Sequence, residues 1–205
     1  MITDRPLRRV GDLSGLPHSA QGPRNVVWWG NLSFMLIEGT GFLLAIGTCL
    51  YLLSQSAQWP PAGIRPPSLG WSGAFTAVLI LSEVPNLWLM RQVRNKSVAR
   101  VRLGMLVMTA IGVLLTALRW FELQHLNTGW DRDAYGSTVW LLMVLHTSHI
   151  VTELGETAVL TAWLYTHEVG DAQLSDVEDD ADYWTFVILA WLPIHLLVYW
   201  VPRWL

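Results

Sequence analysis

Long apolar stretches separated by short polar segments make up most of the chain. A helix needs about 20 mainly apolar residues to cross the hydrocarbon core of a bilayer. Five stretches meet this requirement, at 26–53, 71–92, 102–121, 135–166 and 183–203. The pattern therefore predicts an all-α, polytopic membrane protein, in which residues 26–205 form a bundle of five transmembrane helices.

The segments between these stretches predict turns and one linker. Residues 58–68 (QWPPAGIRPPS) are rich in Pro and Gly, which mark turns, and residues 125–133 are polar. Residues 167–182 predict an acidic linker, whose part at 176–182 we interpret as a solvated loop rather than a proton-collecting surface. Residues 1–25 lack the apolar core of a signal peptide, so we expect a flexible cytoplasmic leader.

The positions of Lys and Arg predict the orientation. The leader and the turn between the second and third spans together hold nine of them, and the opposite side holds four: Arg65, Arg119, Arg132 and Arg203. Cytoplasmic segments carry the excess of Lys and Arg. We therefore expect the N-terminus in the cytoplasm and the C-terminus outside.

Composition agrees with a membrane protein. The chain of 205 residues is 52% hydrophobic and 14% charged, with 13 Trp, whereas soluble domains are about 25% charged. The net charge of −3 gives no sign of nucleic-acid binding. The single cysteine, Cys49, excludes a disulfide framework and any centre built on several cysteines.

Several ionisable residues lie inside the predicted spans. A charged group at the bilayer centre costs at least about 2.5–3.5 kcal/mol, so such residues face the interior of a bundle. The fourth span has four such residues, which at about 100° per residue fall within a sector of about 80°. They are His146, His149, Glu153 and Glu156. Glu38, Glu83 and His195 occupy the first, second and fifth spans.

Three interpretations of this polar stripe remain open. Glu and His at i, i+3 and i+4 build metal sites in helical bundles, although such sites use two or more helices. Chains of Glu and His also form proton pathways through membranes. The third interpretation is a hydrogen-bonded seam that holds helices together.

An ordered set of motifs resembles the cytochrome c oxidase subunit III family. WWGNLSFMLIEG (28–39) is similar to its first glutamate-bearing helix, and WFELQHL (120–126) stands where the family has QxxEY. AYGST (134–138) followed by His146-x-x-His149 is similar to its AYGS and HxxH motifs. VEDDADYWTFVILAW (177–191) and the closing LLVYWVPRW (196–204) complete the set. The resemblance covers 26–204 and is to the short, five-helix form.

The chain also departs from the family pattern. The histidine and aspartate that follow the family's Tyr-Trp pair are Thr185 and Ile188 here, and a family glycine is Glu153. Glu83 and Glu156 have no counterpart in the family. The chain therefore resembles a divergent member.

The resemblance implies a non-catalytic accessory subunit of a respiratory haem–copper oxidase in a bacterial inner membrane. It implies haem and copper in partner subunits, no cofactor of its own, bound phospholipid, and contact with subunit I, whose stability and proton uptake it supports. Glu38 would be the buried carboxyl, with His146 and His149 near it and Glu153 and Glu156 extending the network. Further candidate residues for this polar network are Glu83, Glu122, Glu178 and His195.

Two alternatives remain. One is a similar protein associated with nitric oxide reductase, and the other is a stand-alone metal- or proton-coupled membrane protein that uses the stripe. The electron donor, cytochrome c or quinol, is not indicated by the sequence.

Overall fold

The computed structural model describes residues 26–205, and the predicted leader at 1–25 lies outside this range. The described residues form helices joined by short loops, with no strand among them. The helices are α1 (Val26–Gln55), α2 (Leu69–Leu81), α3 (Glu83–Arg94), α4 (Val98–Gln124), α5 (Ala134–Thr166) and α6 (Asp171–His195). A π-helical turn, η1 (Leu196–Trp200), and α7 (Val201–Trp204) continue α6 to the C-terminus.

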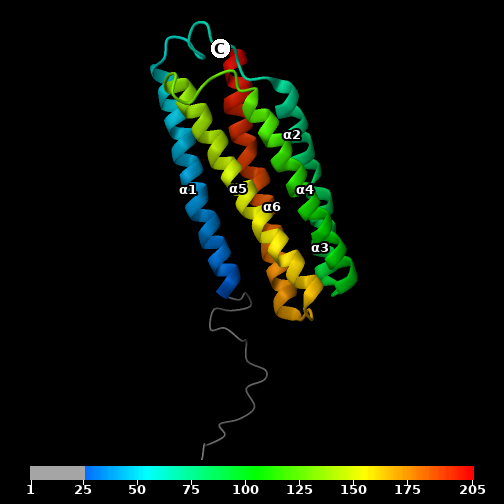
Figure 1. The fold of residues 1–205 in the computed structure, drawn as a ribbon. Helices are drawn as coiled ribbons and strands as arrows, with labels where there is room; N and C mark the ends of the chain where they lie inside the picture. The colour runs from blue at the N-terminus through cyan, green and yellow to red at the C-terminus, as the bar shows by residue number, and fades with distance from the viewer. Residues whose placement is uncertain (1–25) are drawn as a thin grey trace, which may run out of the picture.

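The helices run alternately up and down in one bundle (Figure 1). The α1–α2 loop, the α4–α5 loop and the C-terminus lie at the upper end, and the start of α1 lies at the lower end with the α3–α4 and α5–α6 turns. The order of the spans therefore agrees with the predicted all-α bundle.

The second span is two helices that meet at Ser82. Pro85 has no N–H to donate to the carbonyl four residues earlier, so the helix is weakened there. The Ser82 hydroxyl donates to the Leu79 carbonyl (2.6 Å) and accepts from Trp184 Nε1 (2.8 Å). The side chain of Ser82 thus ties this interruption to α6.

Four helical segments of the described chain are long and apolar enough to cross a membrane: α1, α2–α3, α4 and the α6–α7 segment. The 33-residue α5 is not among them, because its His, Glu, Ser and Thr residues lower its mean hydropathy. It nevertheless packs against α1, α4 and α6. The chain is therefore a helical, multi-pass membrane protein, while the fifth crossing and the orientation stay predictions.

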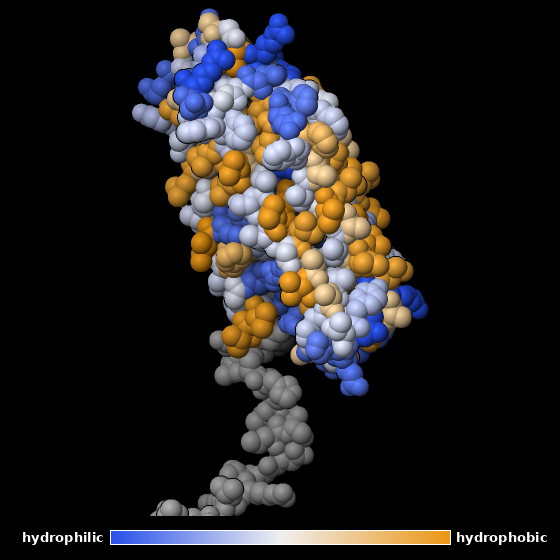
Figure 2. Space-filling view, viewed as in Figure 1, coloured by the Kyte–Doolittle hydropathy of each residue, from blue (hydrophilic) through white to orange (hydrophobic). Residues whose placement is uncertain are grey.

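Apolar side chains also cover much of the outer surface. Figure 2 shows orange residues over the middle of the molecule and blue residues concentrated at its two ends. On α1 only Phe42, Ala45 and Cys49 are buried, at helical spacing. Leu36, Ile37, Leu43, Leu44 and Leu50 of the same helix are exposed. This face can stay in contact with lipid or with a partner helix.

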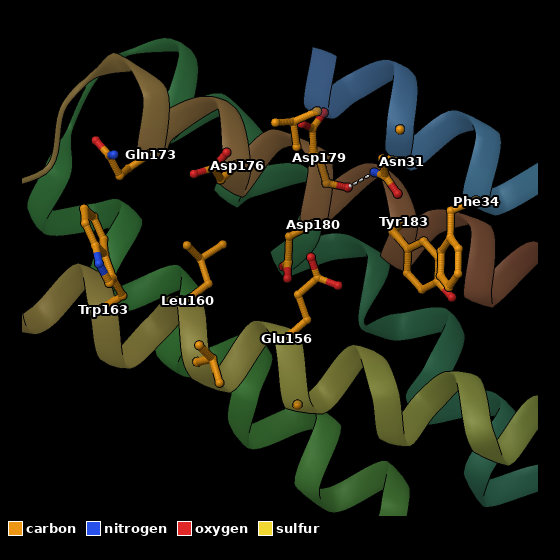
Figure 3. Close-up of a pocket in the computed structure, with 14 residues that line it drawn as sticks. Asn31, Phe34, Glu156, Leu160, Trp163, Gln173, Asp176, Asp179, Asp180 and Tyr183 are labelled. Carbon is orange, nitrogen blue, oxygen red and sulfur yellow. Dashed lines mark hydrogen bonds between the residues drawn. The ribbon is translucent and has the colours of Figure 1, made fainter. Parts of the chain in front are cut away.

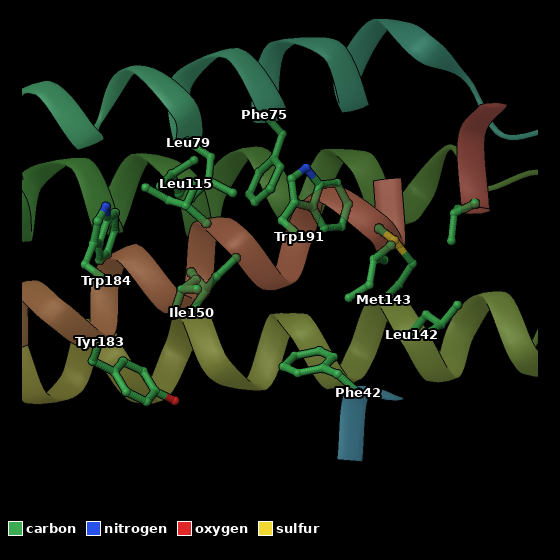
Figure 4. Packing of buried hydrophobic residues seen from close by; sticks show 14 of the residues in the cluster. Phe42, Phe75, Leu79, Leu115, Leu142, Met143, Ile150, Tyr183, Trp184 and Trp191 are labelled. Atoms are coloured by element: carbon green, nitrogen blue, oxygen red, sulfur yellow. The ribbon is translucent and has the colours of Figure 1, made fainter. Parts of the chain in front are cut away.

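The core lies between α2, α4, α5 and α6. Phe75, Leu79, Leu115 and Trp191 are fully buried there and lie close together in Figure 4. Gly104 of α4 has Leu89 of α3 beside it, with a side-chain carbon 2.8 Å from where a Cβ would stand. Glycine therefore lets these two helices approach closely.

The prediction of an acidic linker at 167–182 is wrong. α6 already begins at Asp171, and only a short turn separates it from α5. Leu174, Val177 and Ala181 are buried at helical spacing, so the apolar side of this segment packs on the bundle. Asp179 and Asp180 are buried as well, so 176–182 is not a solvated loop.

Candidate functional site

Glu38 stands at the centre of one polar group, the lower cluster, in the half of the bundle where α1 begins. One carboxylate oxygen of Glu38 lies 3.0 Å from His149 Nε2 of α5. The other accepts a hydrogen bond of 2.5 Å from the Tyr183 hydroxyl of α6. His149 Nδ1 lies 2.7 Å from the Leu145 carbonyl, so it carries the proton and donates there. One carboxyl group thus joins three helices.

Further carboxyl groups belong to the same cluster. Glu153 is buried, and within residues 26–205 neither of its oxygens has a hydrogen-bond partner. Asp180 is also buried and accepts a hydrogen bond of 3.0 Å from Thr157. Glu153 lies one turn of α5 from His149, which contacts Glu38, and one turn from Thr157, which contacts Asp180. The cluster is therefore strongly acidic.

A cleft of about 860 Å³ opens beside these residues, between α1, α5 and α6. Glu156, Asp176 and Asp180 form its acidic side, and Tyr183 lines it as well. In Figure 3 the carboxyl groups of Glu156 and Asp180 point toward one another from α5 and α6. Asn31 of α1 closes one side by donating to the Asp179 carbonyl (2.7 Å). The acidic cluster therefore has a polar opening at its edge.

A second polar group, the upper cluster, surrounds Arg119 of α4. The Arg119 and Glu122 side chains are each 1% exposed and form an ion pair of 2.6 Å. The guanidinium lies 3.8 Å above the Phe75 ring and 4.2 Å from the Trp191 ring. Glu122 also accepts from the Tyr199 hydroxyl at 2.7 Å. The charge is held in the core by pairing and by aromatic faces.

His146 belongs to the upper cluster rather than to the Glu38 group. Arg119 donates to its Nδ1 (2.9 Å), because arginine has no acceptor. Its Nε2 lies 3.1 Å from the Val187 carbonyl and must donate there. These two partners fit the neutral Nε2–H tautomer. The stripe on α5 is therefore divided between two sets of partners, although the Phe42 ring of α1 lies near both histidines, 6.2 Å from His146 and 4.6 Å from His149 between ring centroids.

Of the remaining candidates, His195 borders the upper cluster, because its ring packs against Trp191 and Tyr199, and the other two make separate contacts. Glu83 accepts from Thr185 (3.0 Å) and Asn86 (3.2 Å) beside the α2–α3 junction. His195 Nδ1 lies 3.1 Å from the Ser72 hydroxyl, between α6 and α2. Glu178 is 3.8 Å from Arg94 near the lower end of the bundle. Each holds two helices together by a local contact.

No three His, Cys, Asp or Glu side chains within 26–205 are arranged to hold a single metal ion. The metal interpretation of the stripe therefore has no geometric support in the described part of the chain. The seam interpretation fits His146, whose two ring nitrogens both have partners. Glu153 does not fit a hydrogen-bonded seam, because its oxygens have no hydrogen-bond partner in the described part of the chain.

Sequence reasoning missed Arg119 and Asp180. The count of Lys and Arg treats Arg119 as an outer charge. Arg119 nevertheless lies in the apolar run LLTALRWFEL, and Glu122 follows three residues later, which is the spacing of a helical ion pair. Asp180 was placed in a linker, although Leu174, Val177 and Ala181 already show helical spacing before it. In the sequence, the ion-pair spacing at Arg119 and the helical spacing before Asp180 are weaker signals than the charge pattern that predicts the orientation and the acidic composition that predicts a linker.

Comparison with known proteins decides the family. The sequence model described as cytochrome c oxidase subunit III matches residues 34–203. The chain belongs to this family. The resemblance drawn from the ordered motifs is thereby confirmed.

This subunit III-family chain is similar to three curated relatives, each named cytochrome c oxidase subunit 3. It is 24% identical over 188 residues to that of Synechocystis sp., covering 90% of this chain and 80% of the relative. It is 27% identical over 208 residues to that of Myxine glutinosa, covering 96% and 77%. The match to that of Struthio camelus, 26% over 150 residues, covers 70% of this chain but only 56% of the relative. Both clusters lie within the matched residues.

Proposed function

We infer that this chain is a non-catalytic accessory subunit of a respiratory haem–copper terminal oxidase in a bacterial inner membrane. The match of residues 34–203 to the cytochrome c oxidase subunit III family is the observation that carries this conclusion. Haem and copper would reside in partner subunits, as the family resemblance implies. Subunit I is the partner we expect it to stabilise.

The outer surface supports a role in assembly. Helix α1 buries only one narrow face within the chain and leaves a broad apolar face exposed. Packing against another apolar helix in the membrane needs close contact rather than charge. Such a surface is suited to docking on a large membrane partner and to holding phospholipid beside it.

The lower cluster supports a role in proton uptake. Glu38, His149 and Tyr183 form a connected set of groups that exchange protons or donate hydrogen bonds. Tyr183 also lines the acidic cleft, which joins this set to the edge of the bundle. The cluster would shape the proton supply of the partner without taking part in electron transfer.

Co-purification tests the assignment. The full chain, carrying an affinity tag, is isolated in mild detergent and examined by optical spectroscopy and metal analysis. We expect large partner subunits that bring haem and copper. A nitric oxide reductase as the partner, or a colourless chain that arrives alone with stoichiometric iron, manganese or zinc, would overturn it.

A kinetic test addresses Glu38. In the purified complex, Glu38→Gln removes the charge that pairs with His149 while keeping the size of the side chain. We expect the initial oxygen consumption rate to be near that of the wild type and the rate to decline sooner during sustained turnover. The matched control is Glu83→Gln, a carboxyl group away from the lower cluster, which should decline like the wild type. Equal decline in all three proteins would contradict the proposed role.

A further inference from the structure

The lower cluster contains more acidic groups than its surroundings can balance. Glu38, Glu153, Glu156 and Asp180 come from three helices. Glu153 lies one turn of α5 after His149, which contacts Glu38, and one turn before Thr157, which donates to Asp180. His149 is the basic group that this cluster contains, and it faces Glu38. Glu156 is exposed and Glu38 is part-buried, whereas Glu153 and Asp180 are buried, so the shortage of counter-charge falls mainly on these two.

The nearby arginines do not supply the missing charge. On α4, which packs against α5, Arg102 donates to the Leu164 carbonyl (2.6 Å) and Arg119 pairs with Glu122. On α3, Arg94 lies against Glu178 at the lower end. From α6 the facing groups are Asp180 and Tyr183, which are acidic or neutral. Among the described residues, no Lys or Arg forms an ion pair with a carboxyl group of the lower cluster.

Glu153 is in the least favourable position of the four. It is 1% exposed, and neither oxygen has a donor among the described residues. An ionised carboxylate without partners in an apolar interior is so costly that the group gives up its charge instead. Asp180 differs, because Thr157 donates to it and it borders the cleft.

We propose that Glu153 is held as the uncharged carboxylic acid and forms, with Asp180, a proton-holding site between the cleft and the Glu38–His149 pair. The O–H bond of Glu153 holds one proton in the apolar interior. When that bond breaks, the proton passes to a carboxylate oxygen of Asp180 or Glu156, which faces the cleft.

The existence of the site is independent of the oxidase assignment, whereas its use rests on the proposed function. A proton held at Glu153 stands beside the Glu38 group and next to groups that reach the edge of the bundle. In an oxidase it would serve as a local proton store. The test below is made on the chain itself, so its failure is distinct from a failure to co-purify with haem and copper.

Infrared spectroscopy of the full chain in lipid nanodiscs tests the site directly. Glutamate labelled with ¹³C separates glutamic acid bands from those of aspartic acid and lipid esters. We expect a carbonyl-stretch band of a protonated glutamic acid at neutral pH, which moves to lower frequency in D₂O. Glu153→Gln should remove this band, and the control Glu83→Gln should keep it.

Each alternative outcome overturns the proposal. A wild-type protein without such a band has an ionised Glu153, and this measurement needs no variant to fold. A band that survives in Glu153→Gln belongs to another residue. A stoichiometric metal ion that is present in the wild type and lost in Glu153→Gln would mean that a cation, not a proton, neutralises the cluster.

Discussion

At the scale of single residues, Arg119 is the strongest case of a charge held inside the bundle. Its guanidinium pairs with Glu122, donates to His146 and lies over both the Phe75 and the Trp191 rings. Removing one member of a buried ion pair leaves the other charge uncompensated, whereas removing both leaves none. The energy of the pair can therefore be separated from the energy of burying it.

A double-mutant cycle measures that difference. Arg119→Met alone should lower the free energy of unfolding by about 3–5 kcal/mol, because Glu122 stays buried and unpaired. Arg119→Met combined with Glu122→Gln should lose less than Arg119→Met alone. Denaturation in detergent, followed by circular dichroism, gives both values. Additive losses would show that the two side chains do not interact.

Tyr183 offers a second test at this scale. Tyr183→Phe removes the hydroxyl that donates to Glu38 and keeps the ring that stacks on Phe34. A hydrogen bond to a charged group contributes about 1.5–3 kcal/mol, so stability should fall by that amount. Tyr165→Phe is the matched control, because Tyr165 is exposed on α5. Equal unfolding temperatures for the two variants would argue against a structural role of the hydroxyl.

At the scale of elements, the start of α5 depends on one close approach. Asp133 caps the helix by accepting from the Gly136 N–H at 2.7 Å. A Cβ on Gly136 would overlap the Gly129 carbonyl oxygen and crowd Thr128. Gly155 lies on the same helix with nothing within 4 Å of its Cβ position. The same substitution therefore has opposite consequences at the two glycines.

Two alanine variants of α5 test this difference. Gly136→Ala should destabilise the protein by about 1–3 kcal/mol, because backbone atoms must move to admit the methyl group. Gly155→Ala should be neutral or stabilise by up to about 1 kcal/mol, because alanine loses less conformational freedom in a helix interior. Thermal unfolding in a single detergent compares them. A neutral Gly136→Ala would mean that the α4–α5 loop shifts easily.

At the scale of the whole molecule, the two clusters occupy different halves of one bundle. The Glu38 group lies with the cleft in the half where α1 begins, and Arg119 lies in the half nearer the α4–α5 loop. Arg119 is buried, so it no longer counts among the outer charges, and the Lys and Arg excess at the lower end becomes larger. The orientation itself stays a prediction from the sequence.

Reporter fusions provide the orientation test. Alkaline phosphatase fused after Leu205 should be active in a bacterial host, because the C-terminus is expected outside. A green fluorescent protein fused before Met1 should fluoresce, because the N-terminus is expected in the cytoplasm. The reverse pattern would place the cleft and the lower cluster on the outer side and remove the proposed route for proton uptake from the cytoplasm.

The apolar runs alone determined the helical, membrane-spanning class, because a helix satisfies its backbone groups within itself and its length must match the bilayer. The ordered motifs likewise determined the family. Which polar residues meet was decided by tertiary structure. His146 and His149 share one helix face, yet His146 bonds to α4 and α6 while His149 contacts Glu38 of α1. Asp180 reaches Thr157 only because α6 begins early and packs on α5. Contacts between helices far apart in sequence depend on how the helices pack, and the periodicity within a single helix does not specify that packing.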